Sequence, residues 1–200
     1  QRDGIAWMRA NPDAWSHESF FAVHNWWHLA LYHLDLGDID EVLALYDGPA
    51  YGKRSPIVLE MIDASAMLWR LMLRGVDVGN RWEAVADNWA PIATAGNYAF
   101  NDMHAMMAFV GSGRTKAAAA VVEAQSAALE RGGDNAAFIS EVGRPATLAI
   151  KAFDAGNYSE VIRLLRPIRS TAHRFGGSHA QRDLLDLTLI EAALRGGETP

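Results

Sequence analysis

The sequence contains no cysteine, so disulfide bonds and thiolate chemistry are excluded. Its apolar runs are too short or too interrupted to cross a bilayer, and we expect no membrane segment. Acidic residues outnumber lysine and arginine by 24 to 18, for a formal net charge of −6, and no basic stripe occurs. A nucleic-acid-binding surface is therefore not expected. Because the absence of cysteine fits a reducing compartment, we expect a cytoplasmic protein.

Strand signals are also scarce, since runs of alternating β-branched and polar residues are nearly absent. Alanine, leucine, methionine and arginine are abundant instead, and all four favour helices. We predict an all-α fold with helix above about 65% of residues, well beyond the usual third. Ser55-Pro56 is predicted to cap a helix, with proline as its first residue. The predicted helices cover residues 16–36, 38–47, 56–73, 80–90, 99–111, 114–131, 138–155, 157–170 and 178–195.

These helices come in pairs joined by a recurring glycine turn, in which a helix ends at glycine and a second helix starts after about one polar residue. Asp38, Asn80, Asn157 and Ser178 are predicted N-caps. Successive turn glycines are 42, 34, 43 and 40 residues apart, a looser spacing than a strict tetratricopeptide period. The turn glycines are Gly37, Gly79, Gly113, Gly156 and Gly196.

Such spacing predicts a right-handed α-solenoid of tetratricopeptide-like helix hairpins. Residues 1–200 would form a single helical-repeat domain. The opening Gln1-Arg2-Asp3-Gly4 is typical of the interior of a longer chain, so we expect a fragment. The approximate hairpins cover residues 16–47, 56–90, 99–131 and 138–170, followed by a half unit at 178–195.

Three segments resemble the tetratricopeptide repeat protein 38 family, which has bacterial and animal members. They are Val23-His24-Asn25-Trp26-Trp27-His28 with the following Leu29–Leu34, Phe100–Met107, and Gly176–Asp183, and they occur in the family's order. The chain is similar to a partial bacterial member, because members of the family are longer at the N-terminus. The resemblance implies a helical-repeat fold and brings no established activity.

An Asn-x2-His pair occurs at the same distance before two turn glycines, as Asn25 and His28 before Gly37 and as Asn101 and His104 before Gly113. Residues three apart share one face of a helix. With His24 and Trp27, these residues form a candidate ligand-binding groove. Packing between repeats is the alternative explanation for the aromatic residues, and hydrogen bonding between repeats is the alternative for the histidines.

His24 and His28 have the i,i+4 spacing that a metal site can use. The zincin pattern H-E-x-x-H is absent, because Asn25 and Trp26 stand between them. About two repeats would also separate His28 from His104, some 20 Å at about 10 Å per repeat. We therefore expect no metal and no cofactor.

The predicted function is a scaffold that binds a peptide, a protein or a small ligand in an aromatic- and histidine-lined concave groove. The alternative is an enzyme whose site uses His24, His28 and His104, with Asp102 or Arg182 as further candidates. Arg182 has two interpretations. It is either an ordinary residue in the first turn of an N-capped helix, or a binding residue that anchors an anionic group. No nucleic-acid or membrane partner is expected.

Helix 178–195 has a wide apolar arc, formed by Leu184, Leu185, Leu187, Leu189, Ile190 and Leu194. Terminal repeats need a polar outer face to stay soluble. We therefore expect some of these side chains to remain exposed. They would be covered either by a second copy, in a homodimer through 178–195, or by a further C-terminal segment.

Overall fold

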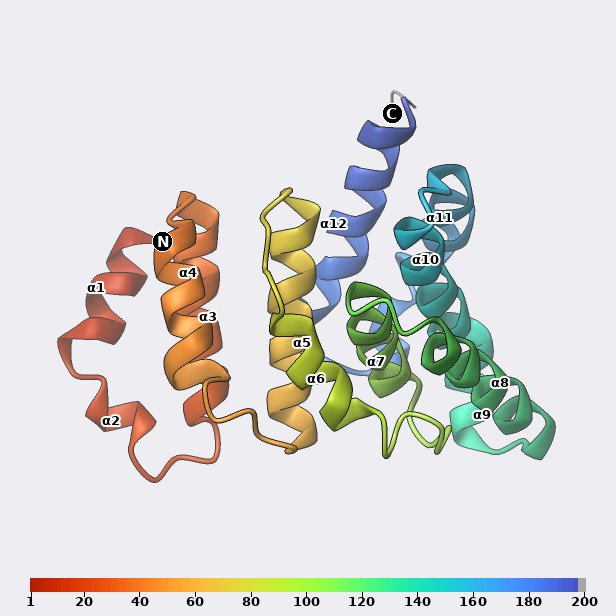
Figure 1. Ribbon diagram of the computed structural model, residues 1–200, viewed down its shortest axis with the longest axis horizontal. Helices are drawn as coiled ribbons and strands as arrows, with labels where there is room; N and C mark the ends of the chain where they lie inside the picture. The colour runs from red at the N-terminus through yellow and green to blue at the C-terminus, as the bar shows by residue number, and fades with distance from the viewer. Residues whose placement is uncertain (198–200) are drawn as a thin grey trace. The chain divides into compact units, whose positions relative to one another are not determined.

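The protein is built from helices, as a computed structural model that describes residues 1–197 shows (Figure 1). Helix accounts for 76% of residues, and the described residues contain no strand. The predicted all-α class and helix content are thus confirmed. Within the same residues, no helix is both long enough and apolar enough to span a membrane.

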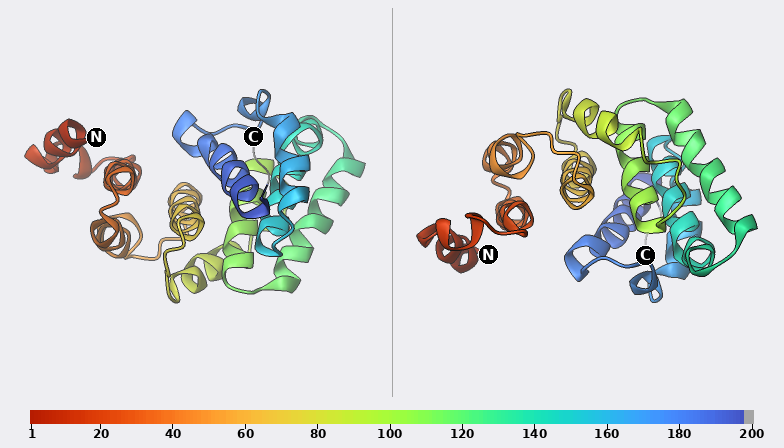
Figure 2. Two further views of the ribbon diagram at one scale, coloured as in Figure 1. Left: turned by 90° about the horizontal axis from the view of Figure 1, so that it is seen from above. Right: turned by 90° about the horizontal axis from the view of Figure 1, so that it is seen from below.

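Two compact units divide the chain, Gln1–Met67 and Leu68–Pro200, and the division falls inside one helix, α5 (Val58–Leu73). The first unit contains α1 (Arg2–Ala10), α2 (Asp13–Ser16), α3 (Ala22–Leu36) and α4 (Ile39–Leu45), followed by a π-helical turn at Tyr46–Ala50. Helix α3 packs on α1, α2 and α4, and Figure 2 shows α3 and α4 end-on, side by side.

The second unit continues α5 with α6 (Arg81–Trp89), α7 (Ala99–Gly111), α8 (Thr115–Arg131) and α9 (Asp134–Phe138). A π-helical turn (Ile139–Gly143) leads into α10 (Arg144–Asp154). Then follow α11 (Tyr158–Leu165), two short 3-10 turns (Arg166–Ile168 and Ala172–Phe175) and α12 (His179–Gly196).

Most of these helices pack on the helix that follows them in the chain. Helix α7 contacts α6, α8 and α10, and α10 contacts α11 and α12. Figure 1 shows these helices lying side by side.

The first predicted helix starts later than expected, at Ala22 instead of residue 16, and α1 was not predicted. Glu18 has a positive φ of 50°, which breaks the helix between α2 and α3. The segment then folds back on itself. The indole of Trp15 packs edge-on against Trp26, with ring centroids 4.6 Å apart, and donates a hydrogen bond to the Met8 carbonyl.

The glycine turns have left-handed φ between 57° and 80° at Gly37, Gly79, Gly113 and Gly156. At Gly79 the prediction that a helix ends there is wrong, because α5 already ends at Leu73. Gly196 is an exception, because it is the last helical residue and the left-handed position is Gly197.

The predicted caps differ in outcome. Ser178 forms a full capping box with Gln181, and the Asn157 side chain accepts from the Glu160 N–H. Asp38 and Asn80 make no side-chain cap hydrogen bond. Ser55 does not cap α5 at Pro56, since its hydroxyl oxygen accepts the Ile57 N–H and the helix begins at Val58.

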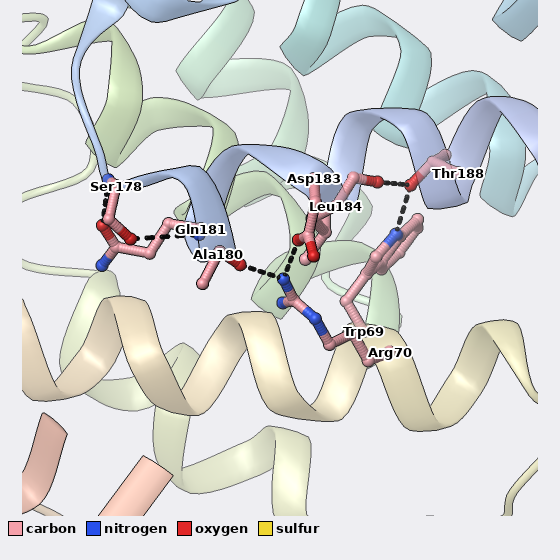
Figure 3. Close-up of polar contacts among 8 residues, drawn as sticks. All are labelled: Trp69, Arg70, Ser178, Ala180, Gln181, Asp183, Leu184 and Thr188. Atoms are coloured by element: carbon pink, nitrogen blue, oxygen red, sulfur yellow. Dashed lines mark hydrogen bonds and ion pairs between the residues drawn. The ribbon is translucent and has the colours of Figure 1, made fainter. Parts of the chain in front are cut away.

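Helix α12 is fixed to the part of α5 that belongs to the second unit (Figure 3). The buried Trp69 indole donates to the Thr188 hydroxyl at 3.0 Å, and that hydroxyl donates to the Leu184 carbonyl. The buried Arg70 guanidinium pairs with Asp183 and donates to the Ala180 carbonyl. These contacts bury Leu184 and Leu185. Leu187, Ile190 and Leu194 remain exposed on α12, as expected for part of that apolar arc.

Candidate functional site

In the first unit, a buried carboxylate and two imidazoles form a hydrogen-bonded chain, here called the imidazole cluster (Asp63, His24 and His28). The Nδ1 atom of His24 lies 2.8 Å from Oδ2 of Asp63, and its Nε2 lies 3.2 Å from Nε2 of His28. Asp63 comes from α5 and is only 1% exposed, whereas both histidines are partly exposed residues of α3. The i,i+4 spacing predicted from the sequence therefore does bring the two rings together.

Hydrogen bonding to Asp63 is the largest effect on His24 and raises the pKa of its imidazole, while partial burial acts in the opposite direction. His24 donates from Nδ1 to the carboxylate. In the hydrogen bond between the two rings, one Nε2 atom donates its hydrogen and the other must be unprotonated to accept it. The two Nε2 atoms therefore share a single proton. The imidazole cluster can thus hold one excess proton readily and a second only if the ring contact breaks.

Trp27 packs against this cluster, as its buried ring stacks on His24 with centroids 5.2 Å apart and planes 17° from parallel. Asn25 lies apart from it and donates to the Trp15 carbonyl, joining α3 to α2. Within residues 1–197, no group of three or more His, Asp or Glu side chains has an arrangement that could hold a metal ion.

The second unit contains a pocket of about 290 Å³ at the turn between α6 and α7. Trp89 and Tyr98 supply aromatic surface, and Asn101 and Asp102 supply polar groups from the first turn of α7. This pocket is close to the lower end of the volumes that bind small ligands, about 300 Å³. We call it the aromatic pocket; its other lining residues are Pro91, Ile92, Ala93, Ala95, Gly96 and Asn97.

Asp102 is the charged group of the aromatic pocket and is 4% exposed. Burial raises the pKa of its carboxyl to about 6, although a hydrogen bond from Gln125 lowers it in part. The Gln125 amide donates at 3.1 Å to Asp102 Oδ2 and at 3.0 Å to the Thr147 hydroxyl. The carboxylate is thus tied through α8 to α10. The Oδ1 atom of the neighbouring Asn101 is buried and has no hydrogen-bond partner in the described chain.

His104 lies in the core of the second unit and lines no groove. It is fully buried, and its Nδ1 donates to the Phe100 carbonyl at 2.8 Å. Burial is the main cause that lowers the pKa of its imidazole to about 4. The two Asn-x2-His pairs therefore have different surroundings, because His28 is partly exposed and bonded to His24.

Arg182 lines a separate surface pocket of about 470 Å³, together with Arg169, His173 and His179. Its guanidinium donates to the carbonyls of Gly176 and Gly177, so it stabilises the loop before α12. Arg169 in turn pairs with Asp186 at 2.6 Å.

The structure thus joins His24, His28 and Trp27 in one unit, and it places Asn101 and Asp102 together in the other. Sequence reasoning missed Asp63, Trp89 and Tyr98. The available signal for Asp63 was its position as a carboxylate within the mostly apolar stretch Met61–Ala66. Burying an unpaired charge costs free energy, so a charged residue in such a stretch indicates a partner. In comparisons with known proteins, no family model matches the chain and no solved structure gives a significant match.

Proposed function

We propose that the protein is a tetratricopeptide-like repeat scaffold that binds a peptide, a protein or a small ligand, with the aromatic pocket as its binding site. The aromatic pocket carries this proposal. It combines apolar walls with a few convergent polar groups, the composition that binding pockets share. His104 has no place in this site, because it is fully buried.

Helix packing in the second unit supports the repeat part of the proposal. Helix α7 contacts both its successor α8 and the corresponding helix of the next hairpin, α10. Helix α10 contacts α11 and α12 in the same way. Each hairpin thus shares its apolar faces with its neighbours, as repeat units do. A right-handed α-solenoid, and membership of the tetratricopeptide repeat protein 38 family, are proposed on this pattern and on the motifs around His24, Asn101 and His179.

Filling the aromatic pocket should abolish ligand binding. Ala95 lines it and is exposed, so Ala95→Phe adds a ring at its mouth without disturbing the core. A fragment screen read by amide chemical shifts should give binders that move Gly96 and Tyr98 in the parent protein and not in Ala95→Phe. Ala137→Phe, at an exposed position of α9, is the matched control and should bind normally. If no fragment moves these amides, the aromatic pocket is not a binding site.

An enzyme is the second candidate, and the imidazole cluster is the observation that favours it. In this cluster the Asp63 carboxylate orients the His24 imidazole, and His24 contacts the His28 imidazole. This arrangement resembles those that activate a general base. In this alternative His28 would meet the substrate, and Asp63 and His24 would set its protonation. His104 would take no part, because it is buried in the other unit.

We further propose self-association through α12. Leu187, Ile190 and Leu194 are exposed at spacings that place them on one face of the helix. The same face on two copies forms a self-complementary two-fold contact. Sedimentation should show a concentration-dependent dimer that Ile190→Lys dissociates, whereas the control Lys116→Glu on α8 should leave it intact. A parent protein that sediments as a monomer at all concentrations excludes this contact.

A further inference from the structure

We propose that the aromatic pocket binds a cation, specifically a primary ammonium or a guanidinium at the end of a short aliphatic chain. The inference rests on the proposed binding function and adds the chemistry of the ligand. It is carried by Asp102, Asn101 and the two aromatic side chains that line the aromatic pocket.

The Asp102 carboxylate has no counter-ion among residues 1–197. Gln125 donates to one oxygen, and within the described residues no other side chain donates to the carboxylate or pairs with it. None of the lining residues is Lys, Arg or His. The Arg131 guanidinium lies beside the lining residue Gly96 and forms no ion pair with Asp102 in the described chain. A nearly buried carboxylate with one hydrogen bond is stabilised when a ligand brings positive charge.

The other lining residues of the aromatic pocket also favour a positively charged ligand. Asn101 also lines the aromatic pocket, and the Oδ1 atom of its amide is buried without a hydrogen-bond partner in the described residues. Trp89 and Tyr98 line the same pocket, and aromatic rings attract ammonium and guanidinium groups to their faces. A neutral apolar ligand would cover the Asp102 carboxylate without giving it a hydrogen bond, and this would cost free energy. Because an ionised carboxylate only accepts hydrogen bonds, the ligand should supply the N–H groups.

A volume of about 290 Å³ accommodates such a group on a short alkyl chain. Two sources share this chemistry, a free alkyl amine or guanidine and the side chain of Lys or Arg in a peptide. Both would place the charged end at Asp102 and the alkyl part against the rings.

Binding of n-butylguanidinium, measured by the amide shifts of Gly96, Tyr98 and Asn101, tests the proposal. Its neutral isostere n-butylurea has the same shape and keeps N–H donors, so their difference isolates the charge. We expect n-butylguanidinium to bind at least about tenfold more tightly, about 1.4 kcal/mol. Asp102→Asn should remove that preference. Glu123→Gln, which removes an exposed carboxylate of α8, should leave it unchanged.

The affinity should also fall as the pH drops through about 6, where Asp102 takes up a proton, and this fall should be absent in Asp102→Asn. If both probes bind equally well, and Asp102→Asn changes neither affinity, the proposed preference for a cation is wrong, but the proposed binding function is not contradicted. No shift with any probe or fragment would reject both. Acetyl-Gly-Arg-Gly-amide distinguishes a peptide side chain from a free amine or guanidine as the natural ligand. If the ligand is a peptide, this tripeptide should bind at least as tightly as n-butylguanidinium. If the ligand is a free amine or guanidine, the pocket should exclude the tripeptide.

Discussion

Replacing Trp69 with alanine should lower the free energy of unfolding of the second unit by about 3 to 5 kcal/mol. Trp69 is fully buried, packs edge-on against Phe153 with ring centroids 5.6 Å apart, and donates to Thr188. The substitution leaves a large cavity and removes a contact between α5 and α12 (Figure 3). Urea unfolding followed by circular dichroism measures the loss.

Two further variants separate the causes. Trp69→Phe keeps most of the packing and loses the hydrogen bond, so it should cost about 1 to 2 kcal/mol. Trp7→Ala removes the same side chain from a position that is 74% exposed on α1, and it should change stability by less than about 0.5 kcal/mol. A loss in Trp7→Ala equal to that in Trp69→Ala would contradict the assigned burial.

Asp63→Asn should destabilise the first unit by about 2 kcal/mol near pH 6, and by less as the pH rises, because it removes a hydrogen bond between charged groups. Asp63 raises the folded-state pKa of His24 above its usual 6.5. A raised histidine pKa contributes stability that is fully present below about 6.5 and is lost as the pH rises through the folded value. The difference between parent and variant should therefore be larger at pH 6 than at pH 9.

The ring resonances of His24 give a direct measurement of that pKa. In Asp63→Asn the pKa should fall below its value in the parent protein, because burial then acts without the opposing carboxylate. Asp3→Asn, at an exposed position of α1, is the control and should leave the His24 titration unchanged. An unaltered His24 pKa in Asp63→Asn would show that the imidazole cluster does not form.

Much of the fold follows from local sequence signals. Residues 99–111 were predicted as a helix with the bounds of α7, because Gly113 forces a left-handed turn beyond it. Ser178 is the N-cap predicted for α12, and Gln181 completes a capping box with it. The start of α3 could not be predicted in this way, because the helix breaks where Trp15 packs against Trp26, a contact that depends on how the chain folds back.

The candidate sites were less predictable, for a related reason. The spacing of His24 and His28 places them together within one helix, whereas Asp63 reaches them from α5. Asn101 and His104 share a helix and a motif, yet Asn101 lines the aromatic pocket and His104 is in the core. Which face of α7 is covered depends on α6, α8 and α10, and no spacing within residues 99–111 encodes those neighbours.

The hydrogen bonds that the Gln125 amide donates to Asp102 and to Thr147 have a consequence for motion. They connect α7, α8 and α10, so opening any of these helices breaks a bond that is nearly inaccessible to water. A ligand that keeps Asp102 ionised strengthens the first of these bonds, since a charged acceptor binds a donor more tightly than a neutral one. Amide hydrogens of α10, none of whose residues line the aromatic pocket, should then exchange with solvent more slowly when it is occupied.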